Sequence, residues 1–581
     1  MDNQRNLIFA VVLCGALLFG WDLLVGRMYP QPAQTEVSAS ADPSKIVHTR
    51  EGGLTNPAEI ALEKRDLATE LAAPDRIRIE GRDIEGSINP VGARIDDVSL
   101  KNHRQTVEKD SGPVRLFSPA GTPAQQFAQF GWAGEGVKLP DARTVWTAEG
   151  DKLTPQTPVT LTWDNGEGQR FSIRFSIDDK YMITAEQTVA NTGAGPIVIQ
   201  PFAFLNRTSR TASLDSWNVH SGPIGSFDGA VDYDWDYDDV AEEGPIALNG
   251  RPDWLGFTDI YWLSALAPQK GTRPDGTFRA LGGDDFRADL IYDPLTVGTG
   301  RQASRTTRLF AGAKESDVLS SYEATGIAHF NRAIDWGWFE ILEKPILWLL
   351  KQLVALVGNF GVAIMLLTVI IRGLMFPIAQ KQFASMAGMR AVQPKMKALQ
   401  ERYKDDRVQL QQEMAKLYKS EGVNPLAGCL PLLLQIPIFF ALYKVLLISI
   451  EMRHQPFALW IKDLSVPDPA HLLNLFGLLP FDPPSFLAIG PLAVILGITM
   501  YLQFKLNPAQ MDPVQQQMFM FMPWVMMFIM APFAAGLLLY WCTSNVLTIA
   551  QQAYLYSRHP QLKEQAEKDK VDKERAKARD S

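Results

Sequence analysis

The sequence predicts a polytopic α-helical membrane protein that also carries a large all-β domain. Hydrophobic residues, 46% of the 581-residue chain, are concentrated in an N-terminal block and in the last third, whereas the middle has the composition of a soluble domain. Within that middle, short runs alternate apolar and polar residues between turn clusters, as in an antiparallel β-sandwich. We therefore expect six membrane spans, namely an N-terminal anchor plus a five-helix core, together with one β-sandwich domain.

The N-terminal residues predict a membrane anchor followed by a linker. Arg5 precedes an apolar run, residues 7–25, that approaches the roughly 20 residues needed to cross a bilayer. This run is longer than the apolar part of an ordinary signal peptide, so residues 1–28 are interpreted as an uncleaved signal anchor. Small residues at 38–41 leave cleavage open as the alternative. Residues 29–59 are rich in Pro, Ala, Ser and Thr without periodicity, which indicates a linker.

Residues 60–330 predict the β-sandwich. Alternating runs occur at 159–163, 171–177 and 196–200, with Asn- and Gly-containing turn clusters between them. No run in this region is long enough to cross a membrane. Aspartates on either side of position 235 are spaced as in a calcium loop, but Tyr237 stands where that loop requires Gly, and the Tyr/Trp alternation favours a strand.

From residue 330 the apolar periodicity becomes helical and predicts the remaining spans. The Trp-rich apolar face and charged flanks of residues 331–352 are typical of a helix lying in the membrane interface, with a ragged start to the next span as the alternative. The expected order is then a second span at 353–376, a cytoplasmic helical hairpin at 377–425, a third span at 426–449, a loop at 450–485, a fourth span at 486–504, a short loop at 505–516, a fifth span at 517–531, a sixth span at 533–555 and a tail at 556–581.

Positive charge predicts the orientation of these spans. Lys and Arg residues crowd the hairpin at 377–425 and the tail at 556–581, and such charges in short flanking segments favour the cytoplasmic side. With six spans, both termini then lie in the cytoplasm and the β domain lies outside, in the periplasm if there is an outer membrane. The hairpin and the tail either contact partners electrostatically or are solvated charged segments.

Arg372 is the most informative single residue, because it interrupts an apolar run that is otherwise suited to hydrocarbon. A guanidinium remains charged at physiological pH, and at the bilayer centre it should face protein or a water-filled cavity. The alternative is that Arg372 lies near the cytoplasmic end of the span and extends to lipid phosphates. Thr368 lies one helical turn earlier on the same face and places a hydroxyl beside it.

Other predicted spans also contain polar residues, which usually bond between helices. We expect most of them to have that structural role and a minority to line a hydrophilic groove with Arg372. They are Gln435, Thr499, Gln503, Thr543, Ser544, Asn545 and Thr548. The methionines of residues 518–530 either adapt to varied apolar partners or fill space between helices.

The sequence lacks the patterns that indicate catalysis, a cofactor or a metal site. It contains no Walker loop, nucleophile elbow or metal-spaced His/Cys group. The three cysteines each lie in an apolar run, which disfavours a disulfide framework. We therefore expect a protein that is not an enzyme and that needs no cofactor, metal or nucleotide.

Motifs spread over the helical part resemble the YidC family of membrane protein insertases, in its Gram-negative form with a large periplasmic domain. One of them is Ile371-Arg-Gly-Leu-Met-Phe-Pro377. The others lie at residues 389–395, 423–429, 435–440, 456–464 and 536–541, the last followed by Ser544 and Asn545. Their order and content cover nearly all of residues 335–558, whereas the β domain matches mainly by size, place and strand character.

The resemblance implies an insertase and chaperone of the bacterial inner (plasma) membrane, which moves nascent membrane proteins from the cytoplasm into the lipid bilayer, alone or with the Sec translocon. It implies a hydrophilic groove open to cytoplasm and lipid, whose residues are Arg372, Thr368, Trp541, Tyr540 and Gln435. Many family members have Tyr in place of Trp541, so an aromatic surface rather than a phenol hydroxyl is expected there.

The resemblance also implies roles for the cytoplasmic hairpin and the tail. The hairpin would capture substrates, and both segments would contact the ribosome. The hairpin residues singled out are Arg390, Lys395 and Lys397.

Two other classes of function compete with this hypothesis. A small-solute transporter or channel predicts intramembrane repeats and broken helices, and no paired repeat is evident in the five C-terminal spans. An anchored periplasmic module that binds sugars or peptides is the second alternative.

Overall fold

The computed structural model describes residues 48–108, 110–215, 219–247, 250–272, 274–403, 406–421, 430–476, 479, 481, 488–506 and 513–558. The chain divides into two compact units, each considered by itself. The β unit comprises Leu24–Gly337 and Ile448–Glu451, and the helical unit comprises Met1–Leu23, Trp338–Leu447 and Met452–Ser581. The predicted anchor at residues 1–28 and nearly all of the predicted tail lie outside the described residues.

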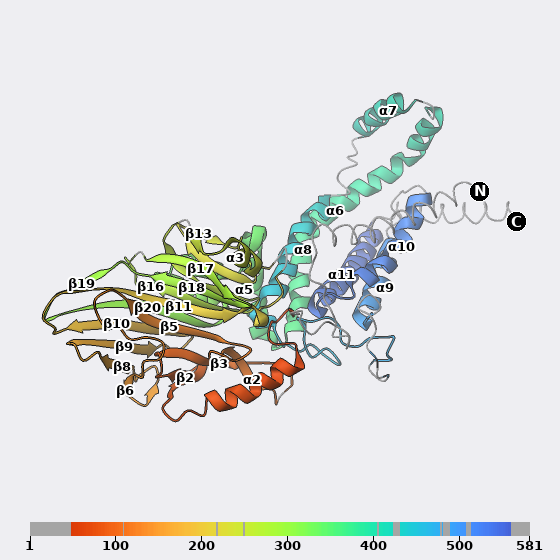
Figure 1. Cartoon of the computed structure of the whole chain (residues 1–581). Helices are drawn as coiled ribbons and strands as arrows, with labels where there is room; N and C mark the ends of the chain where they lie inside the picture. The colour runs from red at the N-terminus through yellow and green to blue at the C-terminus, as the bar shows by residue number, and fades with distance from the viewer. Residues whose placement is uncertain are drawn as a thin grey trace. The chain divides into compact units, whose positions relative to one another are not determined.

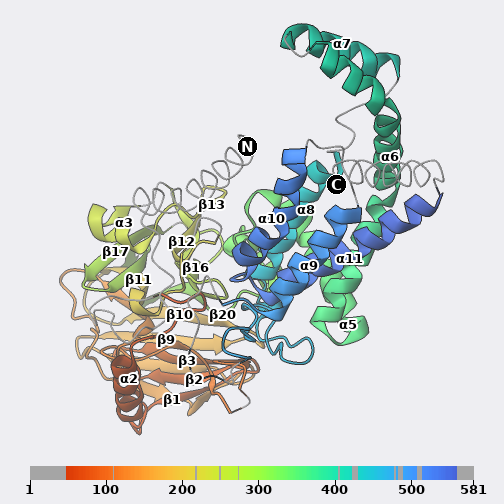
Figure 2. The same cartoon turned by 90° about the vertical axis from the view of Figure 1, so that its right-hand side faces the viewer.

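The helical unit is built from apolar helices that pack around a shared core (Figures 1 and 2). Its helices are α5 (Glu340–Val357), α6 (Phe360–Arg402), α7 (Arg407–Ser420), α8 (Leu430–Ile448), α9 (Pro491–Leu506), α10 (Pro513–Met530) and α11 (Ala535–Arg558). Helix α11 packs against α6 and α9, and α10 packs against α9. The core includes Leu367, Leu442, Leu496 and Leu538, one from each of four helices.

The boundary between α5 and α6 differs from the predicted one. The second span was expected at 353–376, but α5 ends at Val357, where Gly358 adopts a left-handed conformation with φ of 70°. Asn359 then begins α6, because its side chain accepts a hydrogen bond from the backbone N–H of Val362. Residues 331–352 were expected as one interfacial helix, but 3-10 turns precede α5 and that helix begins only at Glu340.

Helix α6 is longer than any predicted element. It continues without interruption from Phe360 to Arg402, so the first half of the predicted hairpin is the same helix as the second span. Figure 1 shows this extension projecting beyond the other helices of the unit and ending near α7. Asp406 caps the start of α7, because its side chain accepts a hydrogen bond from the backbone N–H of Gln409.

Hydropathy supports one complete span among the described residues. The segment Phe360–Gln380, with mean hydropathy 2.3, is long and apolar enough to cross a membrane. Three further segments, Gln435–Ile448, Pro491–Lys505 and Met520–Met530, are apolar but shorter. The count of six spans therefore stays a prediction.

The β unit contains two antiparallel sheets over the described residues, apart from one short parallel pairing between β1 and β7. The first sheet has the order β14 (Ile246–Ala247), β17 (Asp275–Gly282), β18 (Asp285–Ile291), β11 (Ile197–Thr208), β5 (Gln126–Ala133), β3 (Arg94–Arg104), β2 (Ile84–Asn89), β1 (Ile77–Glu80) and β7 (Lys152–Leu153), with β19 (Leu295–Val297) and β4 (Pro113–Phe117) beside it. The second has the order β13 (Ala230–Asp232), β12 (Gly222–Phe227), β15 (Pro252–Thr258), β16 (Trp262–Pro268), β20 (Arg301–Ala313), β10 (Met182–Asn191), β9 (Gln169–Ile177), β8 (Val159–Asp164) and β6 (Thr147–Glu149).

The predicted alternation corresponds to the buried faces of these sheets. In β9, buried Phe171, Ile173 and Phe175 alternate with more exposed residues, which is the pattern used to predict this strand. Polar contacts also join the two sheets. Gln126 of β5 donates a 2.8 Å hydrogen bond to the hydroxyl of Ser264 in β16, within the buried interior.

The β unit also contains helices that the all-β prediction omitted. They are α2 (Pro57–Glu70), α3 (Tyr237–Glu243) and α4 (Ser316–Ala324). The Tyr/Trp alternation near position 235 was expected to form a strand, but β13 ends at Asp232 and α3 begins at Tyr237. The reason is a capping box, in which Asp236 and Asp239 each accept a hydrogen bond from the other's backbone N–H.

A fully buried ion pair lies in the interior of the β unit. The Arg207 guanidinium is 2.8 Å from the carboxylate of Asp259, which also accepts a 2.8 Å hydrogen bond from the backbone N–H of Ser213. Burial alone would lower the pKa of Arg207, but the facing carboxylate outweighs burial and raises it. The pair therefore remains charged, and each partner depends on the other for compensation.

Replacing Asp259 by Ala would leave the Arg207 charge buried without its carboxylate. We expect the free energy of unfolding of the β unit to fall by about 3–5 kcal/mol. Urea unfolding of the full chain in detergent, followed by near-UV circular dichroism, measures this loss. The control is Lys152→Ala, which breaks the Lys152–Glu80 pair whose side chains are 50% and 47% exposed, and which should cost about 1 kcal/mol or less. Equal losses in the two variants would contradict the assignment.

Candidate functional site

Arg372 lies in the apolar part of α6 and is turned toward α11. Its Nε donates a 3.1 Å hydrogen bond to the hydroxyl of Ser544, and a terminal guanidinium nitrogen contacts the same oxygen. The Arg372 side chain is half-buried, whereas Ser544 is only 3% exposed. Within the described part of the chain no carboxylate pairs with Arg372, so a hydroxyl holds the guanidinium while its charge remains uncompensated.

Thr368 lies one turn before Arg372 but its hydroxyl is used within the helix. Thr368 is 1% exposed, and its Oγ1 donates a 2.7 Å hydrogen bond to the backbone carbonyl of Ile364. This bond satisfies the hydroxyl without a partner from another helix. In this arrangement Thr368 contributes to packing beside Arg372, and a substrate could reach it only after a movement of the surrounding helices.

Two other predicted groove residues meet each other. The side-chain amide of Gln435 in α8 donates a 2.7 Å hydrogen bond to the hydroxyl of Tyr540 in α11. Tyr540 is buried and Gln435 is half-buried. Because an unpaired amide or phenol would be costly in an apolar bundle, this bond joins α8 to α11 at a defined register.

Trp541, the remaining predicted groove residue, follows Tyr540 on α11 and is half-buried. Its ring packs edge-to-face against Phe439 of α8, with 5.2 Å between ring centroids. The indole therefore presents an aromatic surface beside the Gln435–Tyr540 bond. A role of this surface in substrate contact stays a prediction.

One further polar contact belongs to the same region of α11. The side-chain amide of Asn545 donates a 3.2 Å hydrogen bond to the hydroxyl of Thr499 in α9, and both residues are buried. Residues 540–545 of α11 thus reach α8, α6 and α9 through Tyr540, Ser544 and Asn545 respectively. We call these three residues with their partners Gln435, Arg372 and Thr499 the polar belt.

Sequence reasoning identified only part of the polar belt as a site. Arg372, Gln435 and Tyr540 were predicted groove residues, whereas Ser544, Asn545 and Thr499 were noted only as polar residues of spans. The available signal was the spacing of Tyr540 and Ser544, which puts both on one face of α11. Which helix each of them meets depends on the packing of segments far apart in the sequence.

The hairpin residues can be placed only in part. Lys395 is exposed on the extension of α6, and its ammonium forms an ion pair with the carboxylate of Glu421, just after α7. This contact ties the extension of α6 to the end of α7. Arg390 and Lys397 lie on α6, but their side chains are outside what the structure describes.

Both units of the chain match models of known protein families. A family model described as the YidC periplasmic domain matches residues 76–349, and one described as the 60Kd inner membrane protein matches residues 352–564. The chain is 44% identical to the membrane protein insertase YidC of Zymomonas mobilis, covering 99% of each chain. It is 41% identical to the protein of the same name from Bradyrhizobium diazoefficiens, covering 96% of this chain and 97% of that protein.

Among solved structures, the crystal structure of an active YidC insertase is similar at 17% sequence identity and a TM-score of 0.35. That match covers 82% of this chain and 92% of the other.

The polar belt predicts a measurable coupling between helices. We expect a double-mutant cycle of Asn545→Ala and Thr499→Val to give a coupling energy of about 0.6 kcal/mol, the average for buried hydrogen bonds between membrane helices. Unfolding of the purified chain in mixed detergent micelles provides the free energies. In the control cycle, Val546→Ala at an exposed neighbouring position takes the place of Asn545→Ala. Its coupling energy with Thr499→Val should be near zero. Strictly additive effects for the first pair would exclude the contact.

Proposed function

The chain belongs to the YidC family of membrane protein insertases, and from that premise we propose how its own residues insert a nascent membrane protein. Insertion is the named activity of its relatives, so the protein is an insertase of the inner membrane and not an enzyme. Its substrates are membrane proteins and its surroundings are the lipid bilayer. The proposals below concern the site, the topology and the partners.

We propose that Arg372 is the centre of a hydrophilic groove bounded by α6, α8 and α11. The observation that carries this proposal is the half-buried guanidinium, which is held by the Ser544 hydroxyl without a compensating carboxylate among the described residues. A guanidinium that no carboxylate neutralises attracts an acidic or polar group. The matching group is the extracellular end of a single-span substrate, which must cross the bilayer first.

The groove lowers the barrier to insertion by shortening the hydrocarbon path. A polar segment crossing the full apolar layer loses its water, at several kcal/mol for each unsatisfied backbone group. Water and polar side chains near Arg372 replace part of that layer. Trp541 then offers an apolar surface for the substrate helix, and transfer of that helix into lipid drives its release without a nucleotide.

The proposed topology is that predicted from the sequence, with cytoplasmic termini, six spans and a periplasmic β unit. The helix α5 supports an interfacial position for the segment before the second span. Leu347, Leu350 and Leu353 on one side of it are buried, whereas Ile341 and Trp348 are exposed. An apolar side chain that protein does not cover suits the boundary between headgroups and acyl chains.

We further propose that the α6–α7 hairpin captures substrates and, with the tail, contacts the ribosome. The support is its exposed basic character, with Lys395, Arg402 and Lys419 among its charged residues, together with its projection beyond the other helices of the unit (Figure 1). Cooperation with the Sec translocon and a chaperone role are proposed on the family resemblance alone.

Replacing Arg372 by Ala removes the charge that attracts the polar segment. We expect insertion of a single-span substrate with an acidic extracellular end to fall to the background of protein-free vesicles. Arg372→Lys should retain part of the activity, because it keeps a cation at this position. Protease protection of the substrate in proteoliposomes is the measurement.

The matched control is Lys505→Ala, which removes a positive charge from the exposed end of α9. This variant should insert the substrate at the wild-type rate. Normal insertion by folded Arg372→Ala protein would refute the proposed role of the charge for this class of substrate.

A photo-crosslinking residue at position 541 tests contact with the substrate. We expect crosslinks to a stalled nascent chain whose transmembrane segment has left the ribosome, because Trp541 lies beside the polar belt. A probe at Val198, on the surface of the β unit, serves as the control and should give none. Equal yields at the two positions would remove the argument for a substrate path along α11.

A further inference from the structure

The loop between α8 and α9 contains a first part that is firmly held by the helical unit. Leu464 is fully buried in the core, and its carbonyl accepts a 2.9 Å hydrogen bond from the N–H of Gly536. The N–H of Ala535 donates to the carbonyl of Val466 at 2.8 Å. The start of α11 is thereby fastened to residues 464–466.

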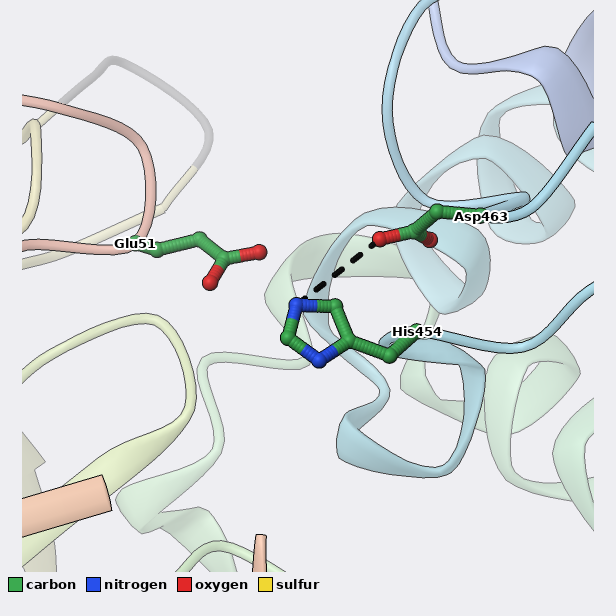
Figure 3. Close-up of side chains that lie close together, drawn as sticks. All are labelled: Glu51, His454 and Asp463. Carbon is green, nitrogen blue, oxygen red and sulfur yellow. Dashed lines mark ion pairs between the residues drawn. The ribbon is translucent and has the colours of Figure 1, made fainter. Parts of the chain in front are cut away.

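Two carboxylates strengthen this first part of the loop. Asp468 accepts hydrogen bonds from the Trp460 indole at 2.9 Å and from the backbone N–H of Leu492 in α9 at 3.0 Å. Asp463 lies 3.9 Å from the His454 ring, as Figure 3 shows, and accepts a 2.7 Å bond from the Ser465 hydroxyl. Glu51, also drawn in Figure 3, belongs to the β unit. Residues 452–470 thus form a fixed platform between the two helices.

The stretch 472–481 differs from this platform because it contains no charged residue. We call its described residues, 472–476, 479 and 481, the apolar tip. Its largest described side chains face outward, with Leu475 52% and Phe476 58% exposed. The other exposed members are Leu472, Leu473, Leu479 and Phe481. In Figure 1 the loop that carries them lies beyond the end of α9.

Such a surface has no counterpart among the described residues of the β unit. In the β unit the large exposed apolar residues are scattered singly along the described residues, for example at Val145, Val198 and Leu281. Scattered residues of this kind are normal on a soluble surface, whereas a contiguous apolar patch marks an interaction site. The apolar tip needs a covering phase that the described part of the chain does not provide.

The backbone of the apolar tip is organised for an environment poor in water. The N–H of Leu472 donates to the carbonyl of Ile489, which closes the base of the loop at 3.0 Å. Within the loop, Phe476 N–H donates to the His471 carbonyl at 2.8 Å, and Leu479 N–H to the Asn474 carbonyl at 3.0 Å. Internal pairing of this kind lowers the cost of placing a backbone near hydrocarbon.

Leu475 and Phe476 also adopt left-handed backbone conformations, with φ of 50° and 61°. This conformation is unfavourable for side chains other than those of Gly, Asn and Asp. Here it turns two large apolar side chains outward in succession. A covering apolar phase would offset the conformational cost.

We propose that the apolar tip inserts into the lipid bilayer at the boundary between headgroups and acyl chains, at the end of the bundle where α8 ends and α9 begins. A stretch of ten residues is too short to span a membrane, but its lack of charge and its exposed Leu and Phe side chains suit an interfacial segment. The start of the tip is fixed beside α9, because the N–H of Leu472 bonds to the carbonyl of Ile489. The helices on either side of the loop are apolar, so lipid is the phase next to the tip. The proposal requires these helices to be embedded in the membrane, but it does not depend on the groove at Arg372.

Spin labels measure this insertion in the full chain, reconstituted in vesicles of phosphatidylethanolamine and phosphatidylglycerol. The background carries Cys14→Ser, Cys429→Ser and Cys542→Ala, and its insertion activity is checked first. Labels are then attached through Leu475→Cys, Phe476→Cys or Leu473→Cys. Two exposed positions serve as references, Ile498→Cys on α9 for lipid and Leu281→Cys in the β unit for water.

At positions 473, 475 and 476 we expect oxygen to relax the spin label more strongly than a water-soluble nickel complex does. The label at position 498 should behave in the same way, and the label at position 281 should show the opposite order. Labels that behave like position 281 would overturn the proposal, because the tip would then be an aqueous loop. Labels shielded from both reagents would overturn it in favour of a protein partner or a second copy.

A charge variant separates this proposal from the groove. Leu475→Asp combined with Phe476→Asp should move a label at position 473 into the nickel-accessible range while leaving insertion activity measurable. An unchanged lipid signature in this variant would contradict the assignment. A loss of activity in Arg372→Ala with a normal lipid signature at 473 would leave the tip proposal intact.

Discussion

The contact between Arg372 and Ser544 is the constraint around which the helical unit is organised. A guanidinium in an apolar helix costs several kcal/mol unless it reaches protein, water or headgroups. The Ser544 hydroxyl satisfies part of the donor capacity without removing the charge. The helices α6 and α11 therefore meet at this level.

Helix α11 supplies three of the six residues of the polar belt, more than any other helix, and this explains why its hydropathy is weak. Tyr540, Ser544 and Asn545 bond to three different helices within two turns. The same residues lower the apolar content of α11, which is long enough to cross a bilayer but does not qualify by composition among the described helices. Hydropathy therefore underestimates a helix whose function is to bind its neighbours through polar contacts.

Local patterns in the sequence predicted the classes of structure well. The alternation at 171–177 corresponds to β9, and the run around Arg372 corresponds to the apolar part of α6. The motifs that carry the resemblance identified the family, because each motif is a run of contiguous residues that can be recognised without knowledge of the packing. The failures have physical causes that a pattern cannot show: Gly358 ends α5 through its backbone conformation, and Asp236 begins a helix where aromatic alternation indicated a strand. The pairing of Arg372 with Ser544 joins segments distant in sequence and follows only from packing.

The continuity of α6 has a mechanical consequence. The helix runs uninterrupted from the polar belt to Arg402, about 45 Å further along its axis at the usual rise per residue. Within this length Pro377 and Pro394 have no backbone N–H, so each removes one hydrogen bond between successive turns and favours a bend. A load applied at the hairpin therefore reaches Arg372 through one continuous helix that has two weakened points, and the arm bends most readily at those two prolines.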